Sequence, residues 1–203
     1  MSIQFIDVAN EAMFMIGGQS IQSLSDPKNR QDRLVSSIID GVRKDLLKDH
    51  RWNGATKRVS LAADVATPAF GYTVQYSLPA DFLRLDRTIP EDQNYKIEGN
   101  KLLTDDDVVN IIYIANEPDP NVLGHNFQTA MKFLLASRCA KALTGDERLS
   151  MSMRNEYDKE LASARYTDSD QASSAEKIRP TLFLSERSRY GNSGSTSSEV
   201  PLL

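Results

Sequence analysis

The period of the hydrophobic residues changes twice along the chain, and this change limits the possible fold more than any other feature. Apolar residues recur at helical spacing up to about residue 50, with a period close to two from about 51 to 116, and at helical spacing again from about 126 to 164. A helix buries one stripe of side chains, whereas a half-buried strand buries every second residue. The sequence therefore predicts an α+β fold, mainly an α-helical bundle of about four helices with an inserted antiparallel β module and an extended C-terminal arm.

Two helices are predicted before the β module. The first runs from Ser2 to Ile16 and ends at Gly17-Gly18, because glycine tolerates the left-handed conformation that closes many helices. The second is predicted to begin at Asp26-Pro27, with Asp26 as N-cap, and to run to about His50. Its predicted apolar stripe is Leu34, Val35, Ile38, Ile39, Val42 and Leu46, and its predicted solvent face is Arg33, Asp40, Arg43, Lys44 and Lys48.

The β module is predicted over residues 51–118, between the two parts of the helical core at 1–50 and 119–166. We expect Trp52 to be a large apolar plug between the helices and the module. The expected strands are Arg58–Leu61, Tyr72–Leu78, Phe82–Arg87, a hairpin over Tyr95–Leu103 that turns at Gly99-Asn100, and Val108–Ala115.

Two more helices are predicted after the module, from about Asn126 to Leu143 and from about Leu149 to Ala164. The break between them is Thr144-Gly145-Asp146. From 167 to 203 we predict an extended or disordered arm, because its Ser-, Asp- and Gly-rich stretches cannot bury enough apolar surface to fold alone.

Side chains suited to catalysis or metal binding are sparse. His50 is expected at a helix end and His125 in a loop before a helix, and two isolated histidines do not make the usual metal spacings. Cys139 is expected to be a small, semi-buried helix residue, and Asp105–Asp107 a solvated turn between strands without the glycine and distal glutamate of a calcium loop. We therefore expect no enzyme and no catalytic, metal-binding or cofactor-binding residues.

Charge and cysteine content limit the partners and the compartment. The formal net charge is −4, whereas proteins that grip nucleic acid through its phosphates are usually basic. The single cysteine excludes a disulfide within one chain. No stretch approaches the roughly 20 apolar residues that span a bilayer, and the N-terminus lacks the pattern of a signal peptide. We expect a protein that is kept in a reducing compartment and does not bind a membrane.

The arm contains one apolar island, Ile178–Leu184, followed by Arg187, Arg189 and Tyr190. Thr181–Leu184 is prone to form a strand, and such a segment could add to a neighbour's sheet or lie in a groove. The alternative is a disordered terminus without a partner.

Three segments carry a resemblance to a known family. Ala12–Leu24 contains a predicted helix, an Ile-Gly step and a Ser-Leu pair; His50–Asn53 ends the long helix with Arg-Trp; and Tyr76–Phe82 has the order Tyr-x-Leu-Pro-x-Asp-Phe. In these segments and in the order of its elements, the chain from about 5 to 165 resembles podovirus tail tubular protein A and related phage head-to-tail adaptors. It departs from them at Gly18-Gln19, where a Gly-Glu pair is commoner.

The resemblance implies a structural protein of the virion neck that is present in the host cytoplasm before assembly. Such adaptors form a dodecameric ring in which the helical bundles pack side by side, and double-stranded DNA passes through the lumen. The expected partners are the portal protein, the tail nozzle protein and other copies of the chain. The residues expected to dock the arm on the portal are Ile178, Arg179, Pro180, Thr181, Leu182, Phe183, Leu184, Arg187, Arg189 and Tyr190. The helix faces expected between subunits contain Arg148, Arg154, Glu156, Lys159 and Glu160.

Two alternatives stay open. The first is another head-completion or stopper protein of the virion neck, with the same helical core at a different position. The second is a small helical nucleic-acid-binding regulator, which would need a clustered basic face. The residues best placed for such a face are Arg43, Lys44, Lys48, Arg51, Lys57 and Arg58.

Overall fold

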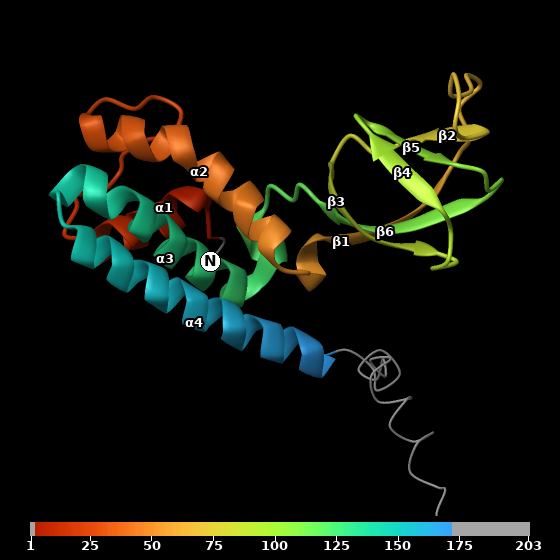
Figure 1. The fold of residues 1–203 in the computed structure, drawn as a ribbon. Coiled ribbons are helices and arrows are strands. Elements are labelled where there is room, and N and C mark those ends of the chain that lie inside the picture. Colours follow the sequence, from red (N-terminus) through yellow and green to blue (C-terminus); the bar gives the residue numbers. More distant parts are fainter. Residues whose placement is uncertain (1–2, 172–203) are drawn as a thin grey trace, which may run out of the picture. The chain divides into compact units, whose positions relative to one another are not determined.

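The computed structural model describes residues 3–171, which contain four α-helices and two small antiparallel sheets (Figure 1). The fold is therefore α+β, as predicted. The described residues up to Asp168 form one compact unit. The predicted arm residues from 172 onward lie outside the described residues.

The helices are α1 (Phe5–Met15), α2 (Arg30–Asp49), α3 (Pro120–Thr144) and α4 (Glu147–Gln171). α3 contacts both α1 and α2, and Tyr157 and Leu161 of α4 belong to the same buried apolar cluster. The predicted helical stripes are confirmed, since their residues are buried or packed against this cluster. Gly17 and Gly145 both adopt positive φ where α1 and α3 end, as their positions predicted.

Several helix boundaries differ from the prediction. α1 begins at Phe5 and not at the predicted Ser2, with Gln4 as its N-cap. α2 begins at Arg30, because Asn29 is the N-cap and its side chain accepts a hydrogen bond from the Asp32 amide at 2.8 Å. The prediction of Asp26-Pro27 as the start was wrong: the Asp26 amide is bonded to the Ser23 hydroxyl within the preceding loop. The prediction did not consider Asn29, whose side chain can cap a helix as well as that of Asp26.

α3 begins earlier than predicted and α4 ends later. Asp119 caps α3 at Pro120, and the helix is interrupted at Gly124, which has φ 81° and ψ 173°. The long segment of α3 after this break begins at His125, close to the predicted start near Asn126, and His125 is its first residue rather than a loop residue. α4 continues to Gln171, through the first residues of the predicted arm, because its chain lacks glycine and proline and the Thr167 hydroxyl bonds to the Ser163 carbonyl.

The β strands confirm the predicted positions to within a few residues. They are β1 (Thr56–Leu61), β2 (Val74–Ser77), β3 (Phe82–Ile89), β4 (Tyr95–Glu98), β5 (Lys101–Thr104) and β6 (Val109–Ala115). One sheet has the order β1-β6-β3 and the other β2-β5-β4, and all pairs are antiparallel. The predicted hairpin joins β4 to β5 and turns at Gly99, where φ is 57°.

The two sheets share a small core of their own. Tyr76, Leu102, Ile111 and Tyr113 are its largest buried residues, and they come from strands of both sheets. Ile114, on the opposite face of β6, belongs instead to the core of the helices. β6 therefore contributes side chains to both cores, since alternate residues of a strand point to opposite faces.

The chain passes from α2 to β1 through a tightly packed step, η1 (Asn53–Ala55). A Cβ atom on Gly54 would lie 2.1 Å from the Val122 carbonyl oxygen, so only glycine allows this approach to the start of α3. Trp52, just before it, is 2% exposed. Its Nε1 donates to the Leu46 carbonyl at 2.8 Å, and its ring meets Phe127 edge-on at 5.1 Å. The prediction that Trp52 is a buried plug is confirmed.

Candidate interaction site

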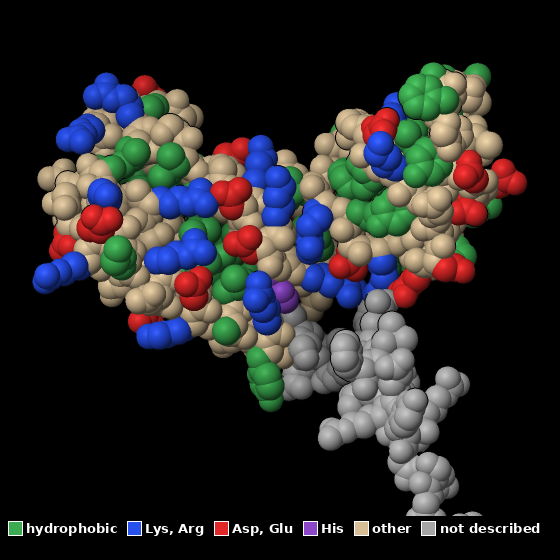
Figure 2. Space-filling view, viewed as in Figure 1, with side chains coloured by type: hydrophobic (Ala, Val, Ile, Leu, Met, Phe, Trp, Pro, Cys, Tyr) green, Lys and Arg blue, Asp and Glu red, His purple; other side chains and the backbone are tan. Residues whose placement is uncertain are grey.

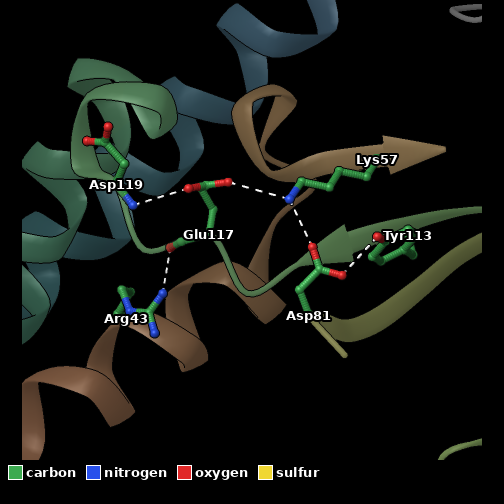
Figure 3. Close-up of polar contacts among 6 residues, drawn as sticks. All are labelled: Arg43, Lys57, Asp81, Tyr113, Glu117 and Asp119. Carbon is green, nitrogen blue, oxygen red and sulfur yellow. Dashed lines mark hydrogen bonds and ion pairs between the residues drawn. The ribbon is translucent and has the colours of Figure 1, made fainter. Parts of the chain in front are cut away.

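A group of polar side chains connects α2 with the strands and with the segment that leads from β6 to α3 (Figure 3). We call this group the polar junction. It consists of Arg43, Lys57, Asp81, Tyr113, Glu117 and Asp119.

Arg43 is the buried end of the junction, with 8% of the residue exposed. Its guanidinium donates to the Glu117 carbonyl at 2.5 Å and pairs with Asp40 at 2.6 Å. The prediction that Arg43 faces solvent was wrong, because the segment after β6 returns past this side of α2 and provides a carbonyl acceptor. The same guanidinium holds the pKa of Asp40 below its usual value, with Lys44 adding to the effect.

Lys57 connects β1 to two carboxylates. Its ammonium lies 2.9 Å from Asp81 and 3.7 Å from Glu117, and the Tyr113 hydroxyl donates to the other Asp81 oxygen at 3.0 Å. The hydrogen bond from Lys57 is the largest cause of a lowered pKa at Asp81, and it raises the pKa of Lys57 in turn. Asp81 belongs to Tyr76–Phe82, one of the three segments that carried the resemblance. Its contacts with Lys57 and Tyr113 help to position the strands.

We predict that Asp81→Asn destabilises the folded protein by roughly 1 kcal/mol at pH 7, the upper end for a partly exposed ion pair. The folded-state pKa of Asp81 is lowered, so its contribution is present above the unfolded pKa of about 4 and is lost as the pH falls through the folded value. Urea unfolding at pH 7 and below pH 4 measures the difference. If the free energies of unfolding of wild type and variant differed by the same amount at both pH values, this role of Asp81 would be contradicted. Asp107→Asn is the matched control on an exposed turn.

The predicted subunit-facing residues all lie on α4, and part of their charge is already paired. Arg154 lies 3.4 Å from Asp158 and over the Tyr157 ring at 4.7 Å, and Lys159 lies 2.7 Å from Glu156. Arg148 is exposed near the start of the helix, and Glu160 is half-buried. These pairs are screened by water, so they leave the charged side chains available to a second protein surface. The predicted portal-docking residues, Ile178–Leu184 with Arg187, Arg189 and Tyr190, lie outside the described residues.

Cys139 and Asp105, two of the residues considered for a chemical role, are held by burial and by hydrogen bonds. Cys139 is fully buried, and burial raises the pKa of its thiol to about 12. Asp105 accepts hydrogen bonds from the Thr73 amide and hydroxyl, which makes the Asp105–Asp107 stretch a braced turn between β5 and β6. Within residues 3–171, no group of three or more histidine, cysteine or acidic side chains is arranged to hold a metal ion.

The basic residues considered for a nucleic-acid face are largely paired with carboxylates. Besides Arg43 and Lys57, Lys44 lies 2.7 Å from Asp40, and Arg51 lies 3.4 Å from Asp86. Lys48 and Arg58 are exposed. The six residues therefore do not form an uncompensated basic face.

The sequence did not predict an exposed surface on the β2-β5-β4 sheet. All four residues of β4 are exposed, and Phe70 in the loop before β2 is 88% exposed. Figure 2 shows hydrophobic side chains gathered over this part of the molecule. Exposed apolar side chains that gather on one face are typical of surfaces that bind another protein.

Comparisons with known proteins do not assign the chain to a family. No protein-family model matches it, and no curated protein matches it. Among the described helices, none combines the length and the apolar character needed to cross a lipid bilayer.

Proposed function

We propose that the chain is a structural head-to-tail adaptor of a tailed bacteriophage, which forms a ring that links the portal to the tail nozzle. The observation that supports this best is the order of the elements. Two helices, a β module and two further helices follow one another along the chain, with Arg51-Trp52 at the end of α2 and Tyr76–Phe82 between β2 and β3. This is the order that the resemblance implies for such an adaptor.

The electrostatics of the chain suit a channel for DNA. Each subunit has a net charge of −4, so a ring of subunits repels the phosphates and allows the duplex to slide. The pairing of basic residues weighs against the nucleic-acid-binding regulator. Each of four candidate residues is paired with a carboxylate: Arg43, Lys44, Arg51 and Lys57. Tight, salt-sensitive binding in a titration with duplex DNA would favour the regulator instead.

Assembly is proposed to use two parts of the chain. The charged face of α4 contacts the neighbouring subunit, with Arg148, Arg154, Glu156, Lys159 and Glu160 offering both signs of charge. The arm docks on the portal through the apolar island, and the nozzle binds at the other face of the ring. The role is structural and needs no catalysis or cofactor.

Sedimentation of the purified chain, alone and with the portal protein of the same phage, tests this proposal. We expect a monomer alone and, with the portal, a complex that contains a ring of adaptor subunits. A chain that sediments as a monomer at every ratio of portal to adaptor, at concentrations well above micromolar, would contradict the proposal. A complex with a different neck protein in place of the portal would favour the stopper alternative.

A further inference from the structure

Strand β4 lies at an edge of the β2-β5-β4 sheet. Within residues 3–171, β4 pairs with β5 alone, so its other edge presents backbone N–H and C=O groups without a neighbouring strand. All four residues of β4 are exposed. Tyr95 and Ile97 are apolar, and they lie on the face of β4 that is turned toward the module core. Tyr95 is 39% exposed and Ile97 is 37% exposed.

Both faces of β4 offer contacts to an added strand. Ile97 is paired with Leu102, which is fully buried in the module core, so one face continues that core to the edge. On the other face, Lys96 and Glu98 line a shallow groove together with Phe70. An added strand with apolar side chains at consecutive positions would therefore cover apolar surface on both of its faces.

The two ends of β4 differ strongly in charge. Glu91 and Asp92 come just before the strand. Thr104 of β5 is paired with Tyr95, so the turn Asp105–Asp107 leaves β5 at the same end of the sheet. At the other end lie Glu98 and Lys101, which are paired with each other across the hairpin. A strand that carries basic residues beyond its C-terminal end is therefore favoured in the antiparallel direction.

We propose that Thr181–Leu184 of a second copy of this chain adds to β4 as an antiparallel strand. With Thr181 opposite Glu98 and Leu184 opposite Tyr95, Leu182 lies opposite Ile97, so both leucines share the face of Tyr95 and Ile97. Phe183 then lies opposite Lys96, on the groove side where Phe70 is exposed.

The same register explains the charges that follow the island. It places Arg187 opposite Asp92 and directs Arg189 toward Glu91. Residues 185–190 contain two basic residues and one acidic residue, whereas 91–92 and 105–107 contain five acidic residues. Parallel addition would instead send Arg187 toward the Gly99-Asn100 turn and Lys101. This inference rests on the proposed function for the presence of a second copy in the ring, and the portal competes for the same segment. Without the ring the contact is weak, so the chain alone still sediments as a monomer.

A peptide of residues 177–190, titrated against the full-length chain by fluorescence anisotropy, tests the strand addition without a portal. The receptor carries Leu182→Asp and Leu184→Asp so that its own segment does not compete. One control peptide is N-methylated at Leu182 and Leu184, and another at Phe183 and Ser185. Because alternate N–H groups of an added strand point to its neighbour, we expect one of the two to lose binding by roughly tenfold or more while the other stays within about threefold of the parent. Equal effects of both N-methyl patterns, or no binding of the parent peptide, would overturn the proposal.

A disulfide test decides whether the contact forms between copies. Full-length chains with Lys96→Cys are mixed with full-length chains with Phe183→Cys under mild oxidation, while Cys139 is buried and does not compete. We expect a covalent heterodimer that forms at least roughly tenfold faster than with Val122→Cys in place of Lys96→Cys, because paired strands hold opposite Cβ atoms close together. Equal rates for the two pairs would overturn the contact between copies. Since neither test contains the portal, their failure is distinguishable from failure of the proposed adaptor function.

Discussion

Trp52→Ala is expected to lower the free energy of unfolding by roughly 3–5 kcal/mol, the typical cost of removing a large buried aromatic side chain. Trp52 is 2% exposed and meets the rings of both His50 and Phe127 edge-on. The substitution opens a cavity in the core of the helices at the point where the chain enters the β module. It also removes the hydrogen bond that Trp52 Nε1 donates to the Leu46 carbonyl.

Urea unfolding followed by circular dichroism measures this loss. Trp52→Phe retains most of the apolar surface but not the N–H donor, so its effect should be clearly smaller than that of Trp52→Ala. Tyr166→Ala, at a position 73% exposed on α4, should change the free energy of unfolding by about 0.5 kcal/mol or less. An unfolding curve of Trp52→Ala that matches the wild type would show that Trp52 contributes little to the core.

Deletion of residues 178–203 is expected to raise the apparent Kd for the portal by about a hundredfold or more. The deletion removes Leu182, Phe183 and Leu184, and each such side chain contributes on the order of 1–3 kcal/mol when it is buried in an interface. The fold should be unaffected, because Met1–Asp168 is a compact unit by itself. The melting temperature should therefore stay within about 2 °C of the full chain.

Full-length chain with Leu182→Asp and Phe183→Asp is the matched control, since it keeps the length of the arm and removes its apolar contacts. It should lose portal binding nearly as strongly as the deletion. A truncated chain that joins the portal as tightly as the full chain would contradict the proposed role of the arm.

Local patterns predicted most of the elements, because helical and strand periods depend on neighbouring residues. Val35, Val42 and Leu46 are buried on α2 as their spacing predicted. The apolar run Val108–Ala115 was predicted as a strand, and it forms β6, which is buried on both faces.

The sequence could not predict the features of the structure that depend on contacts between distant segments. Arg43 is buried because the Glu117 carbonyl returns to it from far along the chain. Gly54 is required by the backbone of Val122, which lies in another helix. No local pattern contains these contacts.

The candidate surfaces were predictable to different degrees. Alternating charges identified the exposed face of α4, since a solvated helix face needs no tertiary information. The exposed edge of β4 could not be predicted, because it depends on the order of the strands in the sheet, with β5 between β2 and β4. The apolar island was visible in the sequence, but its partner was not.

A cryo-electron microscopy map of the neck of purified virions tests the adaptor proposal most directly. We predict a ring of copies of this chain between portal and nozzle, with the α4 helices at subunit boundaries and density for residues 178–190 against a neighbouring protein. Virions whose neck is complete without this polypeptide, or that contain it elsewhere, would contradict the proposal.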